Sequence, residues 1–157
     1  MTVDVPELIQ KAFSNRKRPS NLYSSAELTG DEIEAVISLQ KFDRYHVPIS
    51  FLQANYDVVF WLSPEAFCYW LPEFVLASIK TEKTLLIVDS IIAMLDRSSN
   101  AEYWDDFFKT RWVLLSKEEL EAMEGWVLWL TDSRDQAYDL AQLDRAFDVI
   151  GILKALK

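Results

Sequence analysis

The chain has 157 residues, among them 16 basic and 25 acidic side chains, so its formal net charge is −9. Half of the residues are hydrophobic and 13% are aromatic, which excludes a disordered chain, and the single Cys68 excludes an internal disulfide. The acidic balance excludes nucleic acid and anionic membranes as natural partners and favours a basic protein.

The length suits a single helical domain over residues 1–157, with about two thirds of the unfolded surface buried in one core. Met1 to Glu7 contain no basic or apolar segment of a secretory signal, and no apolar run approaches the roughly 20 residues of a membrane span. We therefore expect a cytoplasmic protein. Residues 81–157 carry 15 acidic and 9 basic side chains, and hence −6 of the net charge.

The first predicted helix covers residues 5–17, with Pro6 at its start and the cations Arg16, Lys17 and Arg18 at its end. Cations complement the negative end of a helix dipole, and we favour this role over a phosphate or nucleic-acid site. The second predicted helix begins at Thr29, which forms a capping box with Glu32, and runs to about residue 40.

Residues 41–48 form a connection that contains the only histidine, His46. Residues 49–55 are compatible with a short helix. Residues 58–62 are β-branched and aromatic, but no second strand is evident, so we interpret them as a buried connector.

A strong helix start follows at Ser63, a favourable N-cap residue before Pro64 and Glu65. The next six residues are all apolar or aromatic, which predicts a helix enclosed by its neighbours. Pro72 lacks an N–H group, so we expect the helix to kink or to restart there. Such a kink either forms a groove or only changes the direction of the chain for packing, and we favour the change of direction.

The order Leu-Ser-Pro-Glu-Ala-Phe at 62–67, then Leu71-Pro72, resembles a family of uncharacterised bacterial domains of unknown function. The resemblance extends in order to Phe13, Pro19, 58–62, 85–95 and 116–130. It implies a small helical bacterial domain and supplies no active-site residues. An Arg is common in that family where this chain has Cys68, which we expect to be a packed thiol.

Residues 84–95 are apolar at nearly every position and predict a second buried helix, whereas residues 101–110 are aromatic and acidic. Capping boxes at Ser116 with Glu119 and at Ser133 with Gln136 open two more helices, each followed by an apolar stripe. The predicted fold is all-α, a compact single-domain bundle of about seven helices with a Pro-kinked, buried central helix.

Signatures of catalysis and cofactor binding are missing. His46 stands alone, no glycine-rich phosphate loop is present, and one Cys with one His does not make a usual zinc site. We therefore expect no enzyme activity, no metal and no cofactor.

Carboxylates recur at helical spacing, with Glu118, Glu121 and Glu124 at i and i+3, and Asp144 with Asp148 at i and i+4. A solvated acidic face is the favoured interpretation. One alternative is a carboxylate-based, metal-dependent hydrolase with its groove at Pro72. Another is a self-associating structural subunit.

By elimination, the sequence favours a protein-binding protein, and specifically a bacterial immunity protein that neutralises a basic toxin. Trp126 and Trp129 lie beside the inward stripe of their helix, so one of the two should be partly exposed and serve as an aromatic anchor. The oligomeric state stays open. The candidate partner-binding residues are Glu102, Asp105, Asp106, Glu118, Glu121, Glu124 and Trp126.

Overall fold

The computed structural model describes residues 4–25, 27–133 and 137–157. These residues form nine α-helices, one 3-10 helix and no strand, so the all-α prediction is confirmed. The number of α-helices exceeds the predicted seven mainly because of two short helices, α3 (Ile49–Ala54) and α4 (Val58–Trp61). Helix α4 lies where we expected a connector, and after it Leu62 forms an isolated antiparallel bridge with Tyr23.

The chain divides into two compact units. The middle unit is Arg16–Ser90, and the terminal unit combines the segment up to Asn15 with Ile91–Lys157. Helix α6 (Leu86–Met94) carries the chain from the middle unit into the terminal unit. The single-domain assignment stays a prediction. Within the described ranges, no helix has the length and apolar character needed to cross a membrane.

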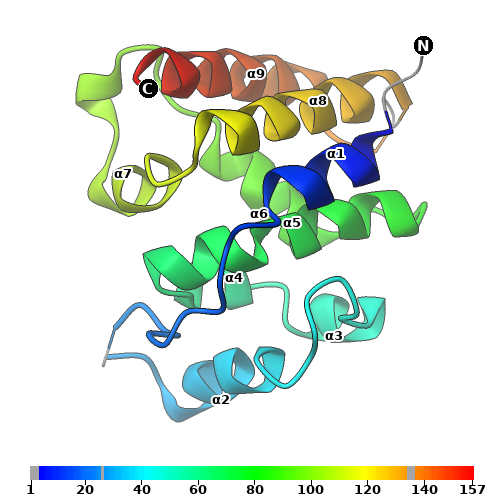
Figure 1. Ribbon diagram of the computed structural model, residues 1–157, viewed down its shortest axis with the longest axis vertical. Helices are drawn as coiled ribbons and strands as arrows, with labels where there is room; N and C mark the ends of the chain where they lie inside the picture. Colours follow the sequence, from blue (N-terminus) through cyan, green and yellow to red (C-terminus); the bar gives the residue numbers. More distant parts are fainter. Residues whose placement is uncertain (1–3, 26, 134–136) are drawn as a thin grey trace. The chain divides into compact units, whose positions relative to one another are not determined.

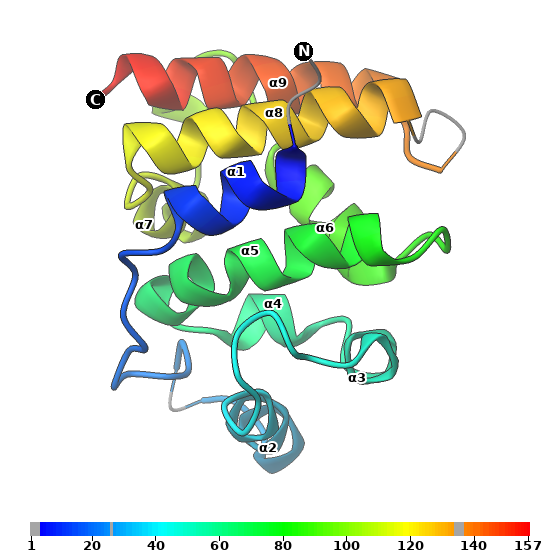
Figure 2. The same cartoon turned by 45° about the vertical axis from the view of Figure 1, so that its right-hand side comes forward.

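Three helices of the terminal unit lie side by side, α1 (Val5–Ala12), α8 (Lys117–Ser133) and α9 (Leu140–Ala155) (Figures 1 and 2). The small residue Gly125 lets α1 approach α8 closely, because a Cβ atom at this position would lie 3.2 Å from Leu8 Cδ2. Helix α8 is therefore covered on two sides, by α1 and by α9.

The segment before α8 contains the 3-10 helix η1 (Ala101–Tyr103) and α7 (Asp106–Trp112). Trp104, Phe108 and Trp112 recur every four residues and share one face of this segment. Their ring centroids lie 5.0 Å and 5.8 Å apart in successive pairs, and all three side chains are buried. Two of the four aromatic side chains in the aromatic and acidic stretch, Trp104 and Phe108, thus belong to the core.

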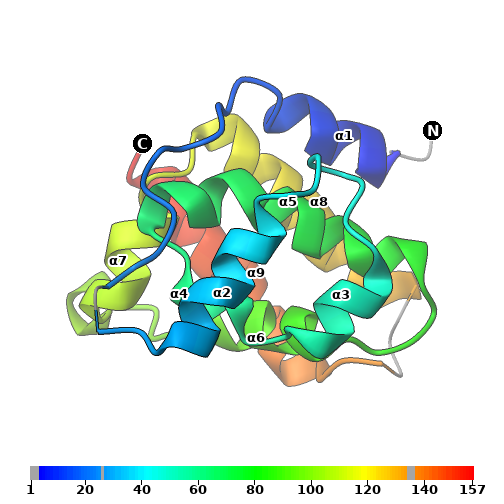
Figure 3. The same ribbon diagram turned by 90° about the horizontal axis from the view of Figure 1, so that it is seen from below.

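The middle unit contains α2 (Gly30–Leu39), which contacts α4, and the long helix α5 (Pro64–Lys80) (Figure 3). Every side chain of α5 from Ala66 to Ser78 is buried, as the apolar run predicted. The buried Cys68 is a packed thiol, also as predicted.

Two predicted helix starts of the middle unit are confirmed. Thr29 and Glu32 form a complete capping box at α2. At α5, Ser63 Oγ accepts from the Ala66 N–H at 3.1 Å and donates to the Asn21 carbonyl at 2.6 Å. The same hydroxyl therefore caps a helix and fixes a distant loop.

Two predicted starts in the terminal unit have different outcomes. The capping box of Ser116 and Glu119 is confirmed, with bonds of 2.8 Å and 3.1 Å. Of the other pair, Gln136 lies outside the described residues and Ser133 is the last residue of α8. Helix α9 is capped instead by Asp139, whose side chain accepts from the N–H groups of Ala141 and Gln142 directly before the apolar stripe.

Of the two outcomes expected at Pro72, a kink or a restart, the restart does not occur. Helix α5 continues through this residue as one helix of 17 residues. The proline removes one backbone hydrogen bond, but burial of the apolar side chains around it offsets that loss.

The first helix is shorter than predicted, since α1 ends at Ala12. The three cations therefore lie beyond it, and Pro19 disfavours helical geometry at Arg18. Arg18 instead donates to the carbonyls of Gln40 and Phe42 at 2.7 Å and 2.8 Å. The predicted dipole interaction thus exists at the end of α2 rather than at the end of α1.

Candidate functional site

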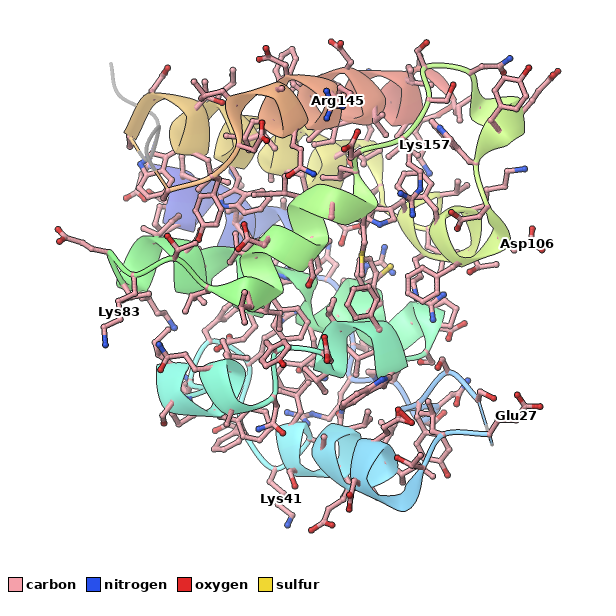
Figure 4. The ribbon with its side chains drawn as sticks, turned by 180° about the vertical axis from the view of Figure 1, so that it is seen from behind. Glu27, Lys41, Lys83, Asp106, Arg145 and Lys157 are labelled. Carbon is pink, nitrogen blue, oxygen red and sulfur yellow. The ribbon has the colours of Figure 1, made fainter. Side chains whose placement is uncertain are left out.

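The predicted acids around the start of α7 differ in their surroundings. Asp105 accepts from the Phe108 N–H at 2.8 Å and pairs with Arg97 at 3.2 Å, so it caps the helix and its charge is balanced in part. Glu102 and Asp106 are exposed, and the Asp106 side chain points outward from the start of α7 (Figure 4). These two acids are accessible to a partner.

Tyr103 lies between these acids and is the most exposed large hydrophobic side chain of the described residues, at 77%. Its neighbour Trp104 is buried and donates its indole N–H to the Ser98 carbonyl at 2.8 Å. At the end of the 3-10 helix, one aromatic ring thus faces solvent and the next is buried. The sequence analysis missed Tyr103 as an anchor, although its acidic neighbour Glu102 is a local signal for exposure.

The acids of α8 do not share one face as expected. A step of three residues falls about 60° short of a full turn, so the row drifts around the helix. Glu118 and Glu121 are exposed, and Leu128 on the same side is 49% exposed. Glu124 is half-buried and pairs with Lys154 of α9 at 3.1 Å. Two of the three predicted acids thus face solvent, and the third joins two helices.

The predicted role of Trp126 as an exposed anchor is wrong, because this side chain is 0% exposed. Trp129 is the partly exposed member of the pair. Helix α8 has neighbours on two sides, so its buried arc is wider than the single stripe read from the sequence, and Trp126 falls inside that arc.

The remaining exposed groups define what we call the acidic surface: Glu102, Tyr103, Asp106, Glu118 and Glu121. Asp106 is the first residue of α7, Glu102 and Tyr103 precede this helix, and the two remaining acids follow it on α8. Helix α7 has seven residues and is therefore about 10 Å long. A standard protein interface buries about 800 Å² on each partner, which is enough to span both ends of such a helix.

Two observations bear on the hydrolase alternative. Within 4–25, 27–133 and 137–157, no three His, Cys, Asp or Glu side chains gather in a way that could hold a metal ion. Asp144 and Asp148 are exposed on α9. A pocket of about 200 Å³ in the middle unit is lined by Leu52, Gln53, Thr84, Leu85 and Leu86, and thus lies away from Pro72.

A buried carboxylate in the middle unit also escaped the sequence analysis. Glu73 is 1% exposed on α5, and its two oxygens accept from the backbone N–H groups of Tyr45 and Val47, the latter at 2.9 Å. Burial raises the pKa of Glu73, and the bond from Val47 and the charge of Lys80 oppose that rise. The signal was present in the sequence, since an acid within a buried apolar run must find partners.

Comparisons with protein-family models, with curated proteins and with solved structures gave no match. The resemblance of the 62–72 segment to bacterial domains of unknown function stays a prediction, and function must be argued from the surfaces themselves.

Proposed function

We propose that this chain is a non-enzymatic, protein-binding protein that holds a basic partner on its acidic surface. The observation that carries the proposal is the 77% exposure of Tyr103 beside Glu102 and near Asp106. Exposed aromatic side chains are frequent anchors of protein interfaces, and flanking carboxylates select a cationic partner.

The charge distribution supports the same proposal. The terminal unit holds 15 acidic and 9 basic residues, against 10 and 7 in the middle unit. Three cations of the terminal unit, Arg97, Arg145 and Lys154, already pair with acids of that unit. The excess negative charge steers a basic protein toward this unit and speeds its association.

In its specific form, the proposal is a bacterial immunity protein whose partner is a basic toxin. Toxin Lys and Arg side chains pair with Glu102, Asp106, Glu118 and Glu121, and Tyr103 takes the anchoring role first assigned to Trp126. When these carboxylates cover a basic active surface of the toxin, the toxin's anionic substrate can no longer bind there.

The first test is affinity purification of the tagged protein from its native host at low and at moderate salt. We expect one basic protein to be retained in near-stoichiometric amount, and mass spectrometry identifies it. Recovery of the tagged protein alone at both salt concentrations would contradict the proposal.

The second test locates the surface with the captured partner. The double variant Glu118→Lys/Glu121→Lys should associate about tenfold more slowly at low salt, whereas Tyr103→Ala should mainly speed dissociation. The matched control is Asp144→Lys/Asp148→Lys, which makes the same charge change on the exposed side of α9. Equal slowing in the control would show that overall charge, and not the acidic surface, governs binding.

A further inference from the structure

The connection between α2 and α3 has an unusual backbone at Tyr45, whose φ of 75° makes it the one positive-φ residue other than glycine in the described chain. This left-handed conformation costs a tyrosine about 1 kcal/mol or more, so surrounding contacts must hold it in place. It turns two backbone N–H groups, those of Tyr45 and Val47, toward Glu73 on α5.

The geometry matches a backbone anion site. N–H groups that converge around a residue in the left-handed conformation form a concave nest for anions. Here the two donors are two residues apart, and each bonds a different carboxylate oxygen of Glu73. A carboxylate, which has two accepting oxygens, satisfies both donors at once.

Two cations, one on the loop and one on α5, also join the loop to this helix. Lys80 Nζ donates to the Tyr45 carbonyl at 3.0 Å. Arg44 donates to the Tyr69 carbonyl at 3.2 Å, and its guanidinium lies 4.4 Å from the centre of the Tyr69 ring and 5.0 Å from that of Tyr45. Arg44 of the loop thus bonds the backbone of α5, and Lys80 of α5 bonds the backbone of the loop.

We propose that residues 44–47 form a carboxylate-binding nest that the chain's own Glu73 occupies, and that this occupation keeps the loop closed on α5. The ligand class of the nest is a carboxylate, and the charged or titratable groups around it are Arg44 and His46 of the loop and Lys80 of α5. When the carboxylate is removed, the left-handed Tyr45 loses its main support and the loop opens while α5 stays folded.

Hydrogen exchange of the Tyr45 and Val47 amides, followed by NMR, tests the closure. In Glu73→Gln, one acceptor oxygen is replaced by a donating NH₂ group of nearly equal size, so we expect about tenfold or greater loss of protection at these two amides. Amides within α5 should keep their protection. The control Glu65→Gln changes an exposed acid of the same helix and should leave both loop amides unchanged. Unchanged protection in Glu73→Gln would overturn the proposal.

A rescue experiment tests the ligand class. In Glu73→Ala, sodium formate or sodium acetate should restore protection at Tyr45 and Val47, and sodium chloride at the same ionic strength should not. If Glu73→Ala does not fold, the same salts are compared for recovery of its helical circular dichroism. Absence of rescue by both carboxylates, or equal rescue by chloride, would show that the nest does not select a carboxylate.

Discussion

The two units use carboxylates in opposite ways. In the middle unit, Glu73 is enclosed and bonds two backbone amides of its own chain, whereas in the terminal unit Glu102, Asp106, Glu118 and Glu121 face solvent. All of these acids belong to helical segments. Burial, and not residue type, therefore decides whether a carboxylate shapes its own fold or remains accessible to a partner.

The same contrast holds for aromatic side chains and gives the largest expected effect. Trp126→Ala should lower the free energy of unfolding by about 4 kcal/mol, because it removes a fully buried ring and leaves a cavity. Tyr103→Ala should change it by less than about 0.5 kcal/mol, since that ring is exposed. Urea denaturation measures both free energies of unfolding. Comparable losses in the two variants would contradict the assignment of Trp126 to the core and of Tyr103 to the surface.

A matched pair of acids sharpens the comparison between the units. Glu73→Ala should cost about 3 kcal/mol of stability, because the N–H groups of Tyr45 and Val47 lose their acceptor inside the fold and the nearby charge of Lys80 is no longer offset. Glu121→Ala removes an exposed acid of α8 and should stay within about 0.5 kcal/mol of the wild type. Thermal and urea unfolding of both variants provide the test, and a neutral Glu73→Ala would mean that the buried carboxylate is dispensable.

The hydroxyl of Tyr45 gives a smaller effect of opposite sign. Its oxygen is buried, has no hydrogen-bond partner in the described part of the chain, and has a pKa raised by burial. Tyr45→Phe should therefore stabilise the protein by up to about 1 kcal/mol, because it removes an unsatisfied polar group and keeps the ring beside Arg44. A loss of stability in urea titrations would reveal an unrecognised partner for this hydroxyl.

The two units should also respond to pH in opposite directions, with the smallest effects. Burial raises the pKa of Glu73 above its ordinary 4.5, so the pH-dependent part of its contribution is present in full below that value and falls as pH rises through the raised pKa, whereas its bonds to the two loop amides contribute on both sides of the transition. In the terminal unit, Arg145 lies on α9 (Figure 4), and its hydrogen bond to Asp96 lowers the pKa of that carboxyl below 3.8. Its contribution is present above 3.8 and is lost as pH falls through the lowered pKa.

Difference profiles measure these two contributions separately. The stability of wild type relative to Glu73→Gln should fall with rising pH, and that relative to Asp96→Asn should fall with falling pH. Two profiles of the same sign would contradict the assignment of one buried and one ion-paired carboxylate.

Local sequence patterns predicted much of the fold because helix starts depend on neighbouring residues. Ser63 with its first turn and the boxes at Thr29 and Ser116 each involve contacts within three residues. The contacts that were missed span long separations. Tyr45 bonds Glu73 across 28 residues and Arg18 bonds Gln40 across 22, and no local period records such pairs.

The candidate site was predicted in part for a related reason. Exposure of Glu118 and Glu121 follows from helical spacing, but the buried position of Trp126 depends on how many neighbours cover α8. Because α1 and α9 both contact α8, the buried arc includes positions that a single-stripe reading leaves outside. Tyr103 escaped notice because a 3-10 turn reverses the side on which successive aromatic rings lie.

The most direct measurement is hydrogen–deuterium exchange of the wild-type protein, alone and with the basic partner that it retains in affinity purification. We expect new protection around η1 and α7 and in the first turns of α8, with no change at the 44–47 nest. Protection confined to the middle unit, or no protection at the acidic surface, would contradict the proposed role of Tyr103 and its neighbouring carboxylates.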